Sequence, residues 1–165
     1  MINRLKDFLA RGGAWTTIQF LIIASVVGLG QWFPQDWPRA LAMTGWAMFG
    51  AGVVVFLAGF MVLGRNLSPY TQPRPGGQLV RRGIYTRLRH PLYTGVILAA
   101  IGWAVGKTSP AALGVALVLI PFFNAKARAE ERWLLKRFPD YAEYARRVPR
   151  FLPRLGRKAH LVCDL

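Results

Sequence analysis

The chain has 165 residues, enough for a single domain, and 53% of them are hydrophobic, which is more than is usual in a soluble protein. It carries 22 Lys and Arg against 7 Asp and Glu, a net charge of +15, and its single cysteine excludes an internal disulfide. So basic a composition is compatible with nucleic-acid binding, but the positions of the charges argue against that class.

Four segments without charged residues predict membrane-spanning helices, at about residues 14–33, 40–63, 91–106 and 110–124. A spanning helix needs roughly 20 apolar residues, so the first two segments are long enough and the last two are short. A tight turn at 106–110 would join the last two into a helical hairpin; the alternative is a buried hairpin inside a soluble domain. We therefore expect an all-α fold, a polytopic membrane helix bundle with about four transmembrane helices, in which residues 1–165 form one domain.

The basic residues flank these spans unevenly. They lie before the first span, between the second and third, and after the fourth, and only Arg39 and Lys107 occupy the other two turns. The positive-inside rule then places both termini and the middle loop in the cytoplasm. The positive charge thus indicates the orientation of the chain in the membrane, and it would attract anionic lipid headgroups. We expect membrane lipids as partners, no nucleic acid, and a location in a prokaryotic inner membrane.

Small residues follow one face of the second predicted span and one face of the third. They are Gly45, Gly52 and Gly59 in the second, and Gly95, Ala99, Gly102 and Gly106 in the third. Such faces let two helices approach closely, which favours packing within the chain. The alternative is that glycine is simply frequent in membrane helices, and the oligomeric state stays open.

The fourth span is expected to continue past the membrane. Ser109 is a plausible N-cap, Pro110 suits the first helical position, and helix-forming sequence runs to about Phe138, interrupted by Pro121. Such a helix is roughly 40 Å long, against a hydrocarbon layer of ~30 Å, so its last turns would project into the cytoplasm. The middle loop is rich in Pro and Gly, yet its segment 78–85 contains apolar residues that indicate an ordered backbone.

Two groups of residues are candidates for chemistry. His90 precedes Pro91, which keeps it out of helical geometry, so it is expected to be the N-cap of the third span, facing a cytoplasmic pocket with Tyr93 one turn further on. The alternative is an interfacial helix start with no ligand. Glu130 and Glu131 diverge by about 100 degrees on their helix and cannot both face one ligand equally. Ion pairs along the helix surface, Glu131 with Arg128 and Glu130 with Lys126, would explain both. Otherwise one of the glutamates holds a ligand cation.

Several motifs occur in the order found in a known family. Leu79-Val80, Gly83-Ile84-Tyr85, the sequence from Arg89 to Gly95, Glu130-Glu131, and Arg147-Val148-Pro149-Arg150 together resemble the isoprenylcysteine carboxyl methyltransferase family, which belongs with the phospholipid methyltransferases. The match covers about residues 63–153, and the first two spans match only in being apolar. The resemblance implies an integral membrane methyltransferase that uses S-adenosyl-L-methionine and releases S-adenosyl-L-homocysteine.

The same resemblance implies a cofactor pocket at about residues 64–153, formed by the middle loop and the C-terminal helices. The implied cofactor-binding residues are Gly77, Gln78, Leu79, Val80, Tyr85, His90, Pro91, Leu92, Tyr93, Glu130 and Glu131. Glu130 would contact the cofactor, with Glu131 in support. Lys126 and Glu130 are the implied catalytic residues, because Lys126 stands where the family has an arginine that meets the substrate carboxylate. No metal is implied.

The molecule that accepts the methyl group is the least defined part of this interpretation. The family implies a lipophilic acceptor, with the carboxylate of an isoprenylcysteine-like molecule favoured. Lysine attracts a carboxylate but lacks the bidentate fork of arginine, so the substitution at Lys126 leaves the substrate open. A phospholipid, a small amine or a thiol are the alternative acceptors. A non-catalytic membrane scaffold or a lipid-binding module are the alternatives from other classes, but a scaffold would leave His90, Tyr93 and Glu130 unexplained.

Overall fold

The computed structural model describes residues 12–68, 70–71 and 76–153. Its helices are α2 (Gly13–Trp32), α3 (Arg39–Leu63), α4 (Pro91–Gly106), α5 (Pro110–Arg137) and α6 (Tyr141–Arg147), with 3-10 turns η1 (Gly64–Asn66) and η2 (Gly83–Thr86). The described ranges contain no strand, which confirms the all-α prediction. The predicted ends of the helices are correct to within one residue.

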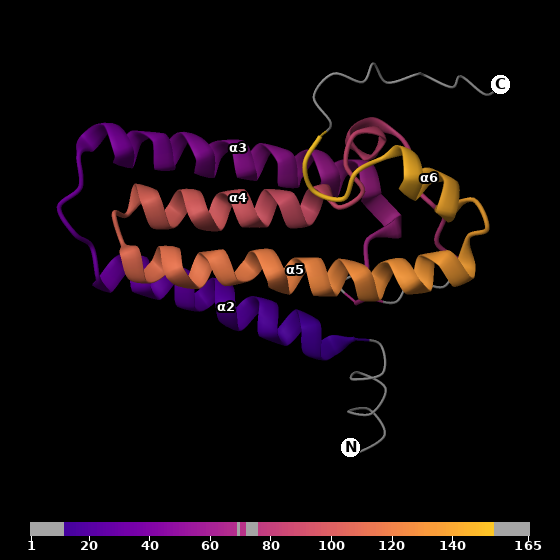
Figure 1. The fold of residues 1–165 in the computed structure, drawn as a ribbon, viewed down its shortest axis with the longest axis horizontal. Helices are drawn as coiled ribbons and strands as arrows, with labels where there is room; N and C mark the ends of the chain where they lie inside the picture. Colours follow the sequence, from indigo (N-terminus) through magenta and orange to yellow (C-terminus); the bar gives the residue numbers. More distant parts are fainter. Residues whose placement is uncertain (1–11, 69, 72–75, 154–165) are drawn as a thin grey trace.

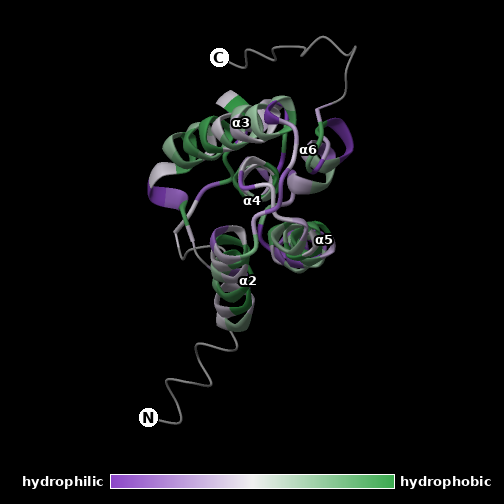
Figure 2. Ribbon diagram, turned by 90° about the vertical axis from the view of Figure 1, so that its left-hand side faces the viewer, coloured by the Kyte–Doolittle hydropathy of each residue, from purple (hydrophilic) through white to green (hydrophobic). Residues whose placement is uncertain are grey.

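Helix α4 lies in the middle of the bundle, where it packs against α3, α5 and α2 (Figures 1 and 2). The α2–α3 and α4–α5 turns lie at one end of the bundle, and α6, the middle loop and the start of α2 gather at the other (Figure 1). Both ends of the described chain are thus on the side of the middle loop. This arrangement agrees with the predicted topology, whose orientation in a membrane stays a prediction.

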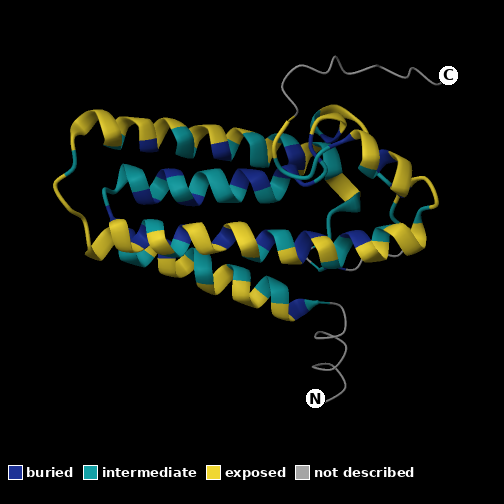
Figure 3. Cartoon of the chain, viewed as in Figure 1, coloured by how far each residue is buried: buried dark blue, intermediate teal, exposed yellow. Residues whose placement is uncertain are grey.

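Among the described residues, three helices are long and apolar enough to cross a membrane: α2, α3 continued through η1 to Asn66, and α5. Large apolar side chains are exposed on their outer faces, where Figure 3 shows most of the exposed residues; they include Phe20, Leu21, Met43, Val54, Met61 and Val118. Exposed apolar surface of this extent indicates contact with lipid. Helix α4 is apolar but shorter and has no exposed residue, so its crossing of the membrane stays a prediction.

Close packing of α3 on α4 through small residues is confirmed. A methyl group added at Gly45 would lie 2.2 Å from the Gly106 nitrogen, and one at Gly102 would lie 2.3 Å from the Phe49 nitrogen. Both distances are far below van der Waals contact, so the two backbones meet without intervening side chains. Helix α4 is thereby fixed along α3, and its first residues are held at the end of the bundle where the loops gather.

The start of α5 is fixed by a buried serine. Ser109 is the N-cap, as predicted: its hydroxyl accepts a hydrogen bond from the Ala112 nitrogen at 3.3 Å and donates one to the Leu29 carbonyl of α2 at 3.1 Å. Pro110 follows at the first helical position, and the helix continues through Pro121 to Arg137. At 1.5 Å per residue α5 is about 42 Å long, so it extends beyond a ~30 Å hydrocarbon layer.

Replacing Ser109 with alanine is expected to lower the free energy of unfolding by about 1–2 kcal/mol, because the cap and the link to α2 are both lost. Thermal unfolding of the detergent-solubilised protein measures the effect. Ser25→Ala is the matched control, since the Ser25 hydroxyl is exposed and bonds only the Leu21 carbonyl of its own helix. Equal stability of the two variants would contradict the assigned role of Ser109.

Candidate functional site

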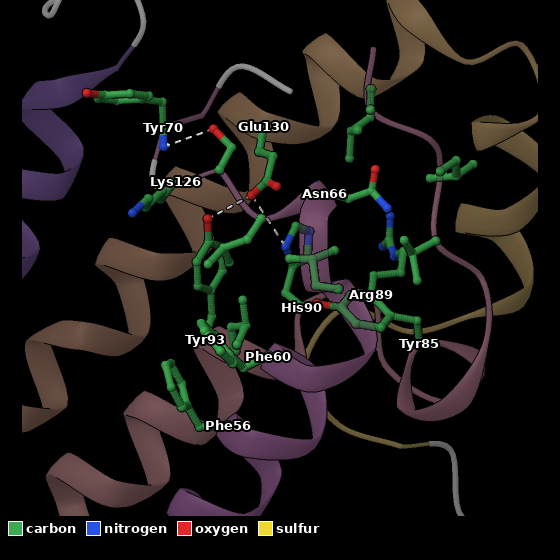
Figure 4. A pocket seen from close by; sticks show the side chains of 18 of the residues that line it. Phe56, Phe60, Asn66, Tyr70, Tyr85, Arg89, His90, Tyr93, Lys126 and Glu130 are labelled. Atoms are coloured by element: carbon green, nitrogen blue, oxygen red, sulfur yellow. Dashed lines mark hydrogen bonds and ion pairs between the residues drawn. The ribbon is translucent and has the colours of Figure 1, made fainter. Parts of the chain in front are cut away.

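A cavity of about 340 Å³ lies at the end of the bundle where the loops gather. Helices α2 to α6 and the middle loop all contribute to its wall, so it forms only when the whole chain is folded. Figure 4 shows that polar side chains around Glu130 occupy one part of it and that Phe56 and Phe60 of α3 occupy another. The cavity therefore has two parts, which we call the polar chamber, around Glu130, and the apolar chamber, around Phe56 and Phe60.

Glu130 presents its carboxylate to the polar chamber (Figure 4). The Tyr93 hydroxyl donates a hydrogen bond of 2.7 Å to Glu130 Oε2, and His90 Nδ1 lies 3.6 Å from the same oxygen. The side chain of Glu130 is 28% exposed. This carboxylate is held by one neutral hydroxyl and one imidazole, so it keeps capacity to accept bonds from a cationic ligand group.

His90 is the N-cap residue of α4, as predicted, but its side chain makes no capping hydrogen bond. The ring instead stacks on Tyr93 with centroids 5.1 Å apart and planes 4° apart, and Nε2 lies 3.1 Å from Glu131 Oε1. Tyr93 in turn stacks on Phe123, with centroids 4.7 Å apart. Because Pro91 is the first residue of the helix, His90 has a non-helical backbone, and its ring lies between the carboxylates of Glu130 and Glu131.

Glu131 lies behind the wall of the cavity. Its carboxylate accepts hydrogen bonds from Arg150 at 3.0 and 2.6 Å and forms an ion pair with Arg89 at 3.0 Å, and its side chain is 10% exposed. Arg150 also donates to Asn124 at 2.6 Å. The bonds to Glu131 raise the pKa of the Arg150 guanidinium. Glu131 thus joins three segments of the chain, and the alternative of a surface pair with Arg128 is wrong.

The middle loop contributes the opposite wall through residues 77–80 and 85. The Gln78 nitrogen donates to Asn66 Oδ1 at 2.9 Å, and Leu79 packs against the apolar cluster around α6. Tyr85 is buried, and its carbonyl accepts a 2.7 Å bond from the Tyr144 hydroxyl. Burial, and next the charge of Glu130, raise the pKa of the Tyr85 hydroxyl. The loop is therefore ordered against α6, as its apolar residues predicted.

Lys126 borders the cavity, one turn of α5 before Glu130. Its ammonium donates to Gln19 Oε1 of α2 at 2.6 Å and lies 5.4 Å from the centre of the Tyr93 ring. The residue is buried, in spite of its charge. An ion pair between Lys126 and Glu130 was one explanation of the glutamates, but the hydrogen bond of Lys126 is to Gln19. The ammonium is therefore held by a neutral partner and faces the cavity.

The structure brings together most of the residues singled out from the sequence. Those that border the cavity are Gly77, Gln78, Leu79, Val80, Tyr85, His90, Leu92, Tyr93, Lys126 and Glu130. Pro91 and Glu131 do not border it, because Pro91 is fully buried against Gly59 and Glu131 is enclosed by arginines. Whether any of these residues binds a ligand stays a prediction.

Sequence reasoning missed three kinds of contributor to the site. Gln19 of α2 and the phenylalanines of α3 lie in charge-free spans whose residues gave no sign of a pocket. Arg89 and Arg150 stand inside the motifs that were recognised, but their common partner could be found only from the fold. In the described part of the chain no group of three or more His, Cys, Asp or Glu side chains lies close enough to hold a metal ion.

The exposed apolar faces, the spans and the enclosed polar chamber define an integral membrane protein with a ligand-sized cavity. Comparison with known proteins then gives its family: the phospholipid methyltransferase family model matches residues 40–141, and the chain belongs to this family. It is also similar to protein-S-isoprenylcysteine O-methyltransferases, which confirms the resemblance found from the motifs. The human enzyme of that name is 32% identical over 126 residues, which cover 71% of this chain and 44% of the human protein.

Two bacterial relatives align with almost the whole chain. The cobalt-zinc-cadmium resistance protein CzcN of Cupriavidus metallidurans is 34% identical over 156 residues, 92% of this chain and 68% of CzcN. The nickel-cobalt-cadmium resistance protein NccN of Alcaligenes xylosoxydans xylosoxydans is 31% identical over the same length, 92% of this chain and 70% of NccN. The chain spans less than half the length of the human methyltransferase, so the acceptor of that enzyme cannot simply be transferred.

Proposed function

We propose that the protein is an S-adenosyl-L-methionine-dependent methyltransferase that acts on a lipophilic acceptor in the membrane. The observation that carries the proposal is the cavity itself, in which a carboxylate, stacked aromatic rings and a buried ammonium face one space. Its volume of about 340 Å³ is within the range of ~300–1,000 Å³ for pockets that hold small ligands. The family match supports the reaction class.

The polar chamber has the chemistry that this cofactor requires. The cofactor supplies an activated methyl group on a sulfonium, together with an amino-acid end that carries an ammonium. Glu130 is the expected partner of the ammonium, and Tyr93 fixes the orientation of that carboxylate. The flat faces of Tyr93 and His90 are suited to a sulfonium, since aromatic rings attract cations. Residues 77–80 and Tyr85 would close the chamber on the loop side.

The apolar chamber supports a lipophilic acceptor. Phe56 and Phe60 of α3 and Phe20 of α2 border it, and Phe20 is 63% exposed on the lipid-facing side of α2. An acceptor could therefore enter from the membrane between α2 and α3. Lys126, whose ammonium lies between Gln19 and the Tyr93 ring, would hold an acidic group of the acceptor beside the cofactor. Methyl transfer to a carboxylate needs orientation and exclusion of water more than a base, so a carboxylate is the favoured acceptor, as in isoprenylcysteine-like molecules.

Glu130→Gln is expected to weaken binding of S-adenosyl-L-homocysteine by about tenfold or more, because an ion pair with the ligand ammonium is replaced by a hydrogen bond from that ammonium to a neutral amide. Calorimetry on the detergent-solubilised protein measures the affinity. Glu143→Gln is the control, since Glu143 is exposed and pairs only with Arg147 on the same helix. Absence of binding to the unmodified protein at millimolar ligand, or equal affinity of the Glu130 and Glu143 variants, would refute the proposal.

The acceptor can be identified by incubating the protein with methyl-labelled cofactor and a lipid extract of its own membrane. A labelled lipid whose label is released by mild base is the expected product, because a methyl ester is base-labile. A base-stable label would instead indicate an amine, thiol or phospholipid-headgroup acceptor. Transfer should be lost in Glu130→Gln and strongly reduced in Lys126→Gln.

A further inference from the structure

Gln19 is a polar residue of α2 whose hydrogen bond goes to another helix. Thr17 and Ser25, on the same helix, donate to carbonyls four residues earlier in α2 itself. The Gln19 side-chain oxygen instead accepts a 2.6 Å hydrogen bond from the Lys126 ammonium of α5. An amide is costly in a helix that is apolar enough to span a membrane, so its presence there calls for a reason other than packing.

The bond between Gln19 and Lys126 lies at the wall of the cavity. Both residues border the cavity, and Lys126 is only 4% exposed. Helix α2 is held against α5 at this level, where the rings of Trp15 and Phe122 lie 5.5 Å apart. Gln19 precedes residues 40–141, which match the family model, so the family match assigns it no role.

Lys126 has a charged candidate partner much nearer in the sequence. Glu130 follows it by four residues, a spacing that brings a lysine and a glutamate together on one face of a helix. Both side chains border the cavity, yet the ammonium bonds Gln19, and in Figure 4 it points away from the Glu130 carboxylate. Glu130 accepts its hydrogen bond from the Tyr93 hydroxyl. The two opposite charges of one helix are thus kept apart.

This separation leaves both charges available to ligands. The amide oxygen of Gln19 fixes the ammonium of Lys126 without cancelling its charge, because the amide is neutral. A direct pair with Glu130 would satisfy both groups within the protein. A ligand would then have to break that pair, in a partly enclosed site where opposite charges attract more strongly than in water.

We infer that Gln19 is a positioning residue that holds Lys126 away from Glu130. The site then offers a free carboxylate to the ammonium of the cofactor and a free ammonium to an acidic group of the acceptor. This inference rests on the proposed function, which assigns those two ligands to the cavity. It gives α2 a part in determining ligand affinity.

The first test measures the affinity for S-adenosyl-L-homocysteine by calorimetry on the detergent-solubilised protein. Gln19→Met keeps the length of the side chain but removes the acceptor, so Lys126 should turn to Glu130 and the affinity should fall by about fivefold. Combining Gln19→Met with Lys126→Met should return the affinity to within about twofold of the unmodified protein, because Glu130 then has no competitor. A purely structural role of Gln19 would not give this recovery.

Gln31→Met is the matched control. Gln31 is also a glutamine of α2, but it is exposed, lies at the opposite end of the helix and does not border the cavity. Its variant should bind the ligand within about twofold of the unmodified protein, as expected for a surface substitution. A loss equal to that of Gln19→Met would show that the effect comes from α2 in general, and would overturn the inference.

Gln19→Glu tests the acceptor side of the site. The introduced carboxylate would pair with Lys126 and cancel its charge, so transfer of labelled methyl to the lipid extract should need about tenfold more extract for half its maximal rate. The inference is overturned if Gln19→Met binds S-adenosyl-L-homocysteine as tightly as the unmodified protein, if the double variant shows no recovery, or if transfer by Gln19→Glu is unchanged. Failure of the unmodified protein to bind the ligand would instead refute the proposed function, and the inference with it.

Discussion

Replacing Gly52 with alanine is expected to lower the free energy of unfolding by roughly 3 kcal/mol or more, or to prevent folding altogether. The added methyl carbon would lie 2.4 Å from the Ala99 nitrogen and 2.7 Å from the Gly95 carbonyl oxygen of α4. These are backbone atoms that cannot rotate away, so α3 and α4 would have to separate. Because α4 carries His90 and Tyr93, separation would also disrupt the cavity.

Gly50→Ala provides the matched control. Gly50 lies in the same helix, and a methyl group there meets nothing within 4 Å. Alanine favours a helix over glycine by about 1 kcal/mol, so this variant should be as stable as the original protein or slightly more stable. Thermal unfolding and gel filtration in detergent compare the two. Similar stability of the Gly52 and Gly50 variants would show that the α3–α4 contact is less close than described.

The sequence predicted the fold well because the signals for it are local. Charge-free segments marked the helices, and Ser109-Pro110 marked the start of α5. Glycines at intervals of seven residues marked the α3 face that α4 packs against. Each of these patterns depends on residues within a few turns of one another. Length alone could not decide whether α4, with 16 residues, crosses the membrane, whereas the three longer helices are long and apolar enough to do so.

The site was predicted less completely, because its contacts join residues far apart in the chain. Lys126 meets Gln19 across 107 positions, and nothing in the sequence around either residue indicates the other. The motif around Arg89 and His90 could be recognised from the sequence. Arg150, whose carbonyl accepts a hydrogen bond from the His90 nitrogen, lies far along the chain, after α6. Helical geometry did predict that Glu130 and Glu131 face different directions. Geometry alone did not say which of them faces the cavity: the family resemblance implied Glu130, and the packing of α5 on α4 places Glu130 there.

The two adjacent glutamates therefore have separate roles. Glu130 borders the cavity, and its variant should change ligand affinity with little effect on stability. Glu131 is enclosed by groups from the α4 N-terminus and from the segment after α6, so it should determine stability. The C-terminal segment is also attached to the start of α4 through its backbone, since the Arg89 and His90 nitrogens donate to the carbonyls of Pro149 and Arg150 at 3.0 and 3.2 Å.

Glu131→Gln is accordingly expected to lower the free energy of unfolding by about 3 kcal/mol. The amide retains the size of the carboxylate but leaves two guanidinium groups, largely removed from water, without a negative partner. Thermal unfolding in detergent measures the loss. In Glu143→Gln, where an exposed pair within one helix is removed, the loss should not exceed about 0.5 kcal/mol.

Comparison of the two variants by ligand affinity separates a structural role of Glu131 from a direct one. At a temperature where Glu131→Gln is still folded, its affinity for S-adenosyl-L-homocysteine should fall much less than that of Glu130→Gln, because Glu131 does not border the cavity. A protein that keeps its stability but loses ligand binding in Glu131→Gln would reverse the assignment. In that case Glu131, and not Glu130, would be the carboxylate that faces the ligand's cationic group.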